Sequence, residues 1–197
     1  MTKSKPKFGL VAVICCLGFA LALVFYMSDA PSGKGGDENH AMSTATGLPA
    51  ELVVHAGPKP LPEVEFRNAS GEVVTLGAYN GNVVVLNLWA TWCAPCREEM
   101  PSLDALQAHF ADAPVTVLAL SLDRGKPDSP LAFLADLGVN SLVFGHDPKS
   151  RSARALGAFG LPTTIIIDPN GREVARLLGE AEWHTTAMTT FISGYLP

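Results

Sequence analysis

The sequence of 197 residues is short of charge and of cysteine. Charged residues make up 17% of the chain, below the roughly 25% of an average soluble domain. Neither the 18 glycines nor the 15 prolines reach the share of a collagen-like or low-complexity chain, and four cysteines are too few for a disulfide-dense scaffold. The formal net charge of −5 argues against a basic nucleic-acid-binding face, so no nucleic-acid partner is expected.

The first 28 residues contain no acid and most of them carry no charge. Residues 8–27 are uncharged, and as a helix they would extend about 30 Å, the thickness of the hydrocarbon layer of a membrane. Three lysines in residues 1–7 predict a cytoplasmic stub, a transmembrane anchor over 8–27 and export of the remainder. A cleaved signal peptide ending near Ser28–Ala30 is the alternative, although an apolar run this long is unusual for one.

The next stretch predicts a tether and then a single domain. Residues 28–50 are rich in Ser, Gly, Thr and Ala without apolar periodicity, which is typical of a flexible linker. Residues 51–197 suffice for one well-formed core, and they contain no internal repeat. Cys15 and Cys16, inside the apolar leader, are interpreted as small apolar residues rather than a thiol pair, because sequence neighbours do not face each other on a helix.

Within the domain, apolar patterns alternate between strand and helix. Near-continuous apolar runs predict strands buried on both faces at Val83–Trp89, Val115–Leu120 and Thr164–Ile167. Further expected elements are a hairpin turning at Asn68–Gly71, a helix carrying Met100 to Phe110, shorter helices over Pro130–Leu137 and Ser150–Leu156, a strand at Arg172–Leu178 and a closing helix carrying Trp183, Ala187 and Phe191. Strands alternating with helices predict an α/β fold, and the tight turn before Arg172 favours a mixed sheet.

The chemistry of the domain is concentrated in its two cysteines. Cys93-Ala-Pro-Cys96 follows a buried strand and opens a helix, where unpaired N–H groups and the helix dipole favour an anion. Pro95 suits the first helical turn. The thiolate is the reactive form of cysteine, and it is favoured at helix N-termini. Cys93 is therefore the expected nucleophile, and Cys96, one turn further on, is the expected resolving thiol of a disulfide exchange.

A purely structural role of the cysteine pair has weaker support in the sequence. A structural zinc site normally needs four ligands, and the five histidines show no ligand spacing, so no metal site is expected. An inert disulfide across two residues at a helix start would be unusual. No cofactor is expected beyond the redox-active Cys93–Cys96 disulfide.

One segment resembles the active-site segment of the TlpA/ResA/CcmG family of thioredoxin-like proteins: Val84–Pro101, with the sequence VVLNLWATWCAPCREEMP. Within that family, the resemblance is strongest to the TlpA proteins. The resemblance covers roughly Leu61 to the C-terminus and the anchored layout of the N-terminus. It implies a thioredoxin fold with a mixed central sheet, an N-terminal hairpin and a central insert, located on the periplasmic side of a bacterial inner membrane. It also implies protein-disulfide reductase activity.

The partners that the resemblance implies are exported proteins with disulfides, in the maturation of cytochrome c or of the copper sites of respiratory oxidases. Electrons would come from a membrane thiol carrier of the CcdA/DsbD type, and residues 8–27 would contact membrane lipid.

Several other residues are expected to shape the site. The resemblance assigns a cis peptide bond facing the dithiol to Pro162, in Gly160-Leu-Pro-Thr163. Trp92 is expected to shield the disulfide and contact a partner, with Ala94 and Thr163 beside it. Asn87 stands where ordinary thioredoxins carry a buried Asp. Since Asn does not titrate, Glu99 is the candidate proton relay, as in ResA-like relatives, with a solvated helix glutamate as the alternative.

Three rival functions remain open on the sequence alone. A disulfide-forming oxidase could use the same fold. A copper chaperone would bind metal through two sulfurs and a distal histidine such as His146 or His184, although copper-delivery relatives usually separate their cysteines by three residues. A thiol peroxidase would consume peroxide without a partner protein.

Overall fold

The computed structural model describes residues 47–197. The expected cytoplasmic stub, the anchor over 8–27, Cys15, Cys16 and the linker up to residue 46 lie outside this range. Within it, none of the helices is both long and apolar enough to span a membrane. Leu48 packs against the main hydrophobic core, so ordered packing begins before Glu51.

The described part of the chain forms one eight-stranded mixed sheet around which the helices pack. Its strands lie in the order β1-β8-β7-β4-β5-β6-β2-β3. Strands β4, β5 and β6 are parallel, whereas the other neighbouring pairs are antiparallel, which confirms the predicted mixed sheet. The strands are β1 (Val53–Pro60), β2 (Glu65–Asn68), β3 (Val73–Thr75), β4 (Val83–Trp89), β5 (Val115–Ser121), β6 (Val143–His146), β7 (Thr163–Ile167) and β8 (Arg172–Leu178).

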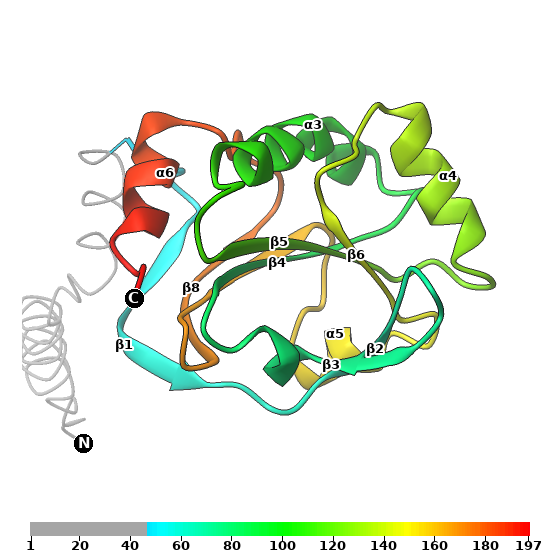
Figure 1. Cartoon of the computed structure of the whole chain (residues 1–197), viewed down its shortest axis with the longest axis horizontal. Coiled ribbons are helices and arrows are strands. Elements are labelled where there is room, and N and C mark those ends of the chain that lie inside the picture. The colour runs from blue at the N-terminus through cyan, green and yellow to red at the C-terminus, as the bar shows by residue number, and fades with distance from the viewer. Residues whose placement is uncertain (1–46) are drawn as a thin grey trace, which may run out of the picture. The chain divides into compact units, whose positions relative to one another are not determined.

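Helices cover both faces of this sheet (Figure 1). Helices α3 (Ala94–His109), α4 (Asp128–Asp136) and α6 (Thr186–Ser193) lie on one face. The short helix α5 (Arg151–Ala155) and the 3-10 turn η1 (Leu76–Tyr79) lie on the other.

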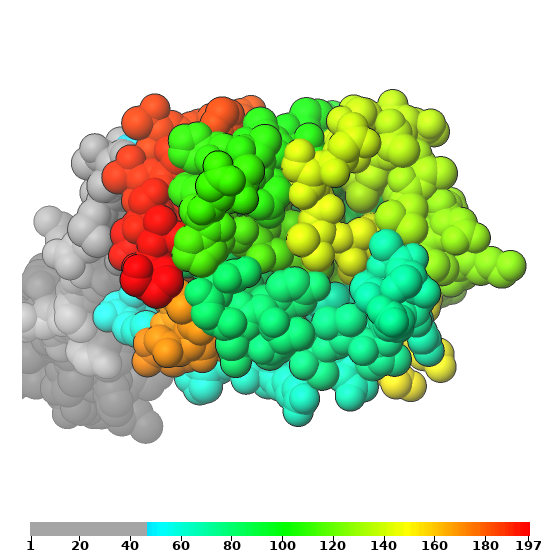
Figure 2. Space-filling model, viewed as in Figure 1, coloured from blue at the N-terminus to red at the C-terminus, as the bar shows by residue number. Residues whose placement is uncertain are grey.

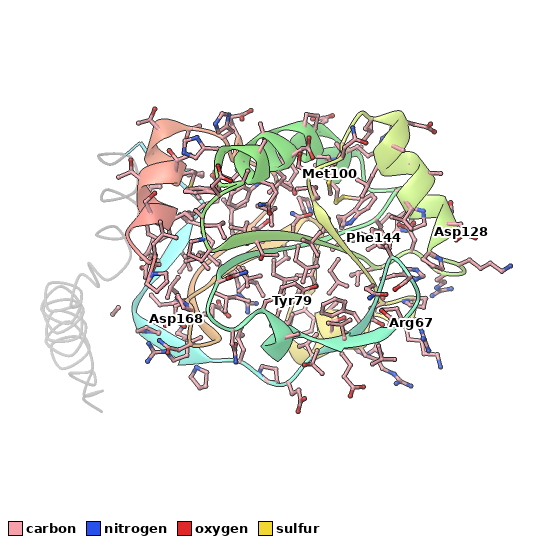
Figure 3. The ribbon with its side chains drawn as sticks, viewed as in Figure 1. Arg67, Tyr79, Met100, Asp128, Phe144 and Asp168 are labelled. Atoms are coloured by element: carbon pink, nitrogen blue, oxygen red, sulfur yellow. A yellow bond between two sulfur atoms is a disulfide. The ribbon has the colours of Figure 1, made fainter. Side chains whose placement is uncertain are left out.

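Side chains of β4 alternate between two hydrophobic cores, because successive residues of a strand point to opposite faces. Val83, Val85 and Trp89 join the core under α3, α4 and α6, to which Met100 of α3 also belongs (Figure 3). Val84, Leu86 and Leu88 join the core under η1 and α5. This alternation turns Asn87 toward α3, and so toward the helix that carries the dithiol.

Most of the predicted elements are present, and one of them is corrected. Strand β4 has the predicted bounds, and the hairpin is β2–β3. The closing helix begins later than expected, at Thr186, after Thr185 caps it by accepting the Met188 N–H. Trp183 therefore precedes the helix, and its side chain is fully buried against α3.

Gly145 of β6 is closely packed by side chains of the two neighbouring strands, β5 and β2. A Cβ atom added there would meet Leu120 Cδ1 and Phe66 Cδ2, each at 2.9 Å. We expect Gly145→Ala to lower the free energy of unfolding by about 1–3 kcal/mol, because overpacking forces neighbouring side chains out of their rotamers. Urea unfolding measures the loss. Gly57→Ala on β1, where a Cβ meets no atom within 4 Å, is the control, and equal stability of the two variants would contradict the prediction.

Candidate active site

Cys93 and Cys96 form a disulfide at the junction between β4 and α3, with an S–S distance of 2.03 Å and Cα atoms 5.3 Å apart. Cys93 is the N-cap residue of α3, and its Sγ accepts the backbone N–H of Cys96 at 3.3 Å. Cys93 is 6% exposed, whereas Cys96 is fully buried. The sulfur that solvent and partners can reach is therefore that of Cys93.

A buried carboxylate fixes the loop that leads to Cys93. Asp123 Oδ2 accepts the Thr91 backbone N–H at 2.9 Å, and its Oδ1 accepts the Thr91 hydroxyl at 2.7 Å. The Ser121 hydroxyl also donates to Asp123, at 2.9 Å. Sequence reasoning missed Asp123. The available signal was an acidic residue just beyond β5, because the carboxyl ends of the parallel strands β4 and β5 meet at the same edge of the sheet.

An open groove of about 900 Å³ runs beside Cys93. Trp92 and Phe159 line it and are 72% and 92% exposed. The other residues that line the groove are Pro95, Leu122, Asp123, Arg124, Ser150, Ala153, Arg154, Ala158, Gly160 and Leu161. The exposure of Trp92 agrees with its expected role in contacting a partner. Phe159 was not singled out from the sequence, because its loop reaches the groove only through the tertiary fold.

The loop before β7 forms another part of the groove. The Leu161–Pro162 peptide bond is cis, as expected, and Leu161 lines the groove together with Cys93. The Thr163 hydroxyl donates to the Gly160 carbonyl at 2.7 Å, and the Gly179 N–H donates to the Pro162 carbonyl at 2.9 Å. Thr163 itself is buried and paired with Leu88 across β7 and β4, so it holds the loop rather than facing the groove. Ala94 is exposed but is not among the groove residues.

Glu99 is buried, with 3% of its surface exposed, one helical turn beyond Cys96. Its Oε1 accepts Asn87 Nδ2 at 2.7 Å, and its Oε2 accepts Trp183 Nε1 at 2.8 Å and the Ala181 N–H at 3.3 Å. Burial raises the pKa of Glu99 to about 7 and outweighs these hydrogen bonds, which lower it. The alternative of a solvated helix glutamate is therefore wrong.

Asn87 connects the carboxyl of Glu99 to the sheet. Its Nδ2 also donates to Thr164 Oγ1 at 2.9 Å, while its Oδ1 is buried without a hydrogen-bond partner among the described residues. Rotation of the amide by half a turn would present Oδ1 to Glu99. Asn87 is thus able to donate to an ionised Glu99 or to accept from a protonated one.

The exposed charges next to the dithiol have different surroundings. The guanidinium of Arg97 lies 5.4 Å from the centre of the Phe133 ring on α4, which holds it on the α4 side of the helix. Glu98 is exposed. Across residues 47–197, no group of three or more His, Cys, Asp or Glu side chains is arranged to hold a metal ion.

Comparison with known proteins agrees with this geometry. Residues 58–175, more than half of the chain, match the AhpC/TSA family. The chain is 34% identical over 110 residues to the thioredoxin-like protein YneN of Bacillus subtilis, a match that covers 56% of this chain and 64% of YneN. It is 28% identical over 130 residues to the thiol-disulfide oxidoreductase ResA of Bacillus thuringiensis, covering 62% and 69%.

A crystal structure described as a thiol:disulfide interchange protein DsbE, from Chlorobium tepidum, superposes with a TM-score of 0.63 at 31% identity. The match covers 71% of this chain and 97% of that one. The described domain thus has a thioredoxin-like α/β fold. The chain belongs to the AhpC/TSA family and, within it, to the TlpA/ResA/CcmG group of thioredoxin-like thiol:disulfide oxidoreductases.

Proposed function

We propose that the chain is a membrane-anchored reductase that cleaves disulfides of exported proteins through Cys93 and Cys96. The observation that carries the proposal is the position of the dithiol, with Cys93 bordering an open groove and Cys96 buried behind it. In such an arrangement a partner's disulfide reaches the Cys93 sulfur before it can reach the Cys96 sulfur.

In the proposed reaction, the Cys93 thiolate attacks one sulfur of the partner's disulfide. The partner's S–S bond breaks, a mixed disulfide forms on Cys93, and the other partner sulfur leaves as a thiolate. Cys96 then loses its proton and attacks Cys93 Sγ, which releases the second partner thiol. Two electrons pass from the dithiol to the partner, and the chain is left with the Cys93–Cys96 disulfide.

Glu99 is the proposed proton acceptor for Cys96. The two residues are three positions apart on α3, so their side chains lie on the same side of the helix. A carboxyl with a pKa of about 7 is well matched to accept and return a proton near neutral pH. Asn87 and Trp183 keep this carboxyl in place by donating to its two oxygens.

The groove is the proposed binding site for the partner segment. Leu161, beside the cis bond, carries backbone groups that make no hydrogen bond within the described domain, so they are available to an extended segment. Pro162 has no N–H donor of its own. The exposed Trp92 offers apolar contact next to the reacting sulfur.

The cellular setting belongs to the same proposal and rests on the resemblance and the apolar leader. Residues 8–27 would anchor the protein in the bacterial inner membrane with the domain in the periplasm. Its substrates would be proteins of cytochrome c or copper-site maturation, and a thiol carrier of the CcdA/DsbD type would reduce Cys93–Cys96 again.

The standard potential of the dithiol distinguishes a reductase from a disulfide-forming oxidase. An oxidase requires a strongly stabilised reduced form, and the exposed acidic Glu98, two residues beyond Cys96, does not favour a thiolate. We expect a potential below about −180 mV, nearer to the roughly −270 mV of thioredoxin than to the roughly −120 mV of the oxidant DsbA.

The potential is measured by equilibrating the full chain in glutathione buffers and counting alkylated thiols by mass. A chain in which both Cys93 and Cys96 are serine is the control for background labelling. A value near −120 mV would assign the protein to the oxidases.

A further inference from the structure

The charges at the groove do not follow the acidic character of the domain. The described residues contain sixteen Asp and Glu but only ten Lys and Arg. Five of those ten cations are exposed on the segment before α4 and around α5, and we call them the basic rim: Arg124, Lys126, Lys149, Arg151 and Arg154. The segment before α4 projects from one end of the face seen in Figure 2.

No carboxylate in the described domain forms an ion pair with the basic rim. The three ion pairs present there involve His55, Arg172 and Arg176, with Glu173 and Asp168 as their partners. Asp168 lies at the opposite end of the domain from Asp128, the first residue of α4 (Figure 3). The basic rim therefore makes no ion pair within the described domain.

Two members of the basic rim, Arg124 and Arg154, line the groove beside Cys93. The only acidic residue that lines the same groove is Asp123, whose oxygens are occupied by Thr91 and Ser121. Arg154 is oriented by donating from Nη2 to the Lys149 carbonyl at 2.8 Å, which leaves its other N–H groups available. The groove lining thus contains two arginines and a single carboxylate, which is buried and hydrogen-bonded within the domain.

Two other residues of the basic rim, Lys149 and Arg151, do not line the groove beside Cys93. Lys149 and Arg151 line a separate cavity that also contains Glu63, Glu65 and Arg67, so their charges are partly balanced there. Arg124 and Arg154 are consequently the pair whose charge is directed to a partner at Cys93.

The groove also offers an apolar contact surface. Trp92 and Phe159 line it and expose most of their surface, and Leu122 and Leu161 also form part of its lining. Exposed aromatic side chains next to a reactive group are typical anchor points of a protein interface. A partner segment would place an apolar side chain there, with its own charges reaching the arginines.

Because the two arginines and the exposed aromatic residues line the same groove, we propose that the protein selects partner proteins by the residues next to their disulfide. The selected partners have an apolar residue and Asp or Glu side chains beside a cysteine of that disulfide. Carboxylates pair with guanidinium groups in a bidentate geometry, and charge complementarity mainly accelerates encounter and selects among partners. A segment with lysines next to its disulfide would be repelled. This inference rests on the proposed function, because it concerns the partner of the same exchange reaction.

The test compares three peptides that differ only in charge. Each contains one disulfide and one leucine beside a cysteine, with two flanking residues that are both Glu, both Gln or both Lys. The reduced full chain is mixed with each peptide, and the second-order rate of its oxidation is followed by acid quenching and thiol alkylation. At low ionic strength we expect the Glu peptide to react about tenfold faster than the Lys peptide, with a smaller ratio at high salt.

Variants locate the source of that ratio. In a chain with both Arg124→Gln and Arg154→Gln, the Glu-to-Lys rate ratio should fall to about twofold or less. Lys59→Gln is the control, because it removes a cation at the far end of the domain. Pro60, the next residue on β1, pairs with Arg172, whose side chain binds Asp168. This variant should keep the ratio of the unaltered chain.

The possible outcomes separate the two proposals. Reaction with all three peptides at equal rates, or a ratio that survives the double arginine variant, would overturn the charge selection while leaving the reductase in place. Reaction with none of the peptides would overturn the proposed function itself. A ratio that falls equally in the Lys59→Gln chain would show a general charge effect and would also refute the role of the groove.

Discussion

A Cys96→Ser chain should accumulate as a mixed disulfide with its partners through Cys93, and a Cys93→Ser chain should capture none. Cys93 borders the groove, whereas Cys96 is fully buried. The Cys93 sulfur can therefore react with a partner's disulfide, and the Cys96 sulfur can then only cleave the mixed disulfide that forms on Cys93. With the nucleophile removed, we expect the rate of disulfide reduction to fall by about 10³-fold or more, to the uncatalysed background.

The measurement is non-reducing electrophoresis of cells that express each variant, with mass spectrometry of the captured proteins. Ala108→Ser, at an exposed position near the other end of the same helix, is a control for unspecific changes of α3. Capture by Cys93→Ser instead of Cys96→Ser would reverse the assigned roles. The captured proteins would also reveal whether the partners belong to cytochrome c or copper-site maturation.

The sequence predicted the centre of the fold far better than its edges. Strand β4 was predicted with its observed bounds because both of its faces are covered, so nearly all of its residues are apolar. Strand β1 was missed because it lies at the edge of the sheet, is mostly exposed, contains Gly57 and two prolines and has an irregular register with β8. Strand β6 has four residues, one of them Gly145, and so shows too little pattern.

The helical spacing around Trp183 was misleading for a tertiary reason. Trp183, Ala187 and Phe191 recur every four residues, but the helix starts only after its cap at Thr185. Trp183 lies before the helix and is buried, and its indole N–H donates to Glu99 of α3, 84 residues away in the sequence. A pattern of neighbouring residues contains no information about such a contact.

The candidate site divides in the same way. The cysteines and the cis bond at Pro162 were accessible because they belong to short motifs. The burial of Glu99 could not be predicted, because Glu98 and Glu99 are the same residue type. Only the contacts of Glu99 with Asn87 and Trp183 distinguish it from the exposed Glu98. Arg124 follows β5, Arg154 lies in α5 and Phe159 lies in the loop before β7, and the fold alone brings them to the groove.

Replacing Glu99 with glutamine should remove a strong pH dependence of stability. The pKa of Glu99 is about 7 in the folded chain, against a value of 4.5 for an unperturbed glutamate, mainly because the side chain is buried. Between these two pH values the unfolded chain loses the proton while the folded chain keeps it. The stabilisation is therefore complete below about pH 4.5 and is lost as the pH rises through about 7, with a total of about 3 kcal/mol.

Glutamine at position 99 keeps one oxygen acceptor for Trp183, and rotation of the Asn87 amide provides an acceptor for its new N–H₂ group, so we expect the variant to fold. Urea unfolding at pH 5 and pH 8 should show a smaller change for Glu99→Gln than for the unaltered chain, by about 2.5 kcal/mol, because the unfolded chain is already partly ionised at pH 5. Glu98→Gln, which removes the exposed neighbouring carboxyl, should keep the full change. An equal pH dependence in all three chains would mean that Glu99 is already ionised in the folded protein at pH 5. A buried carboxylate with that property would be a poor proton acceptor for Cys96, and the resolving step would need another base.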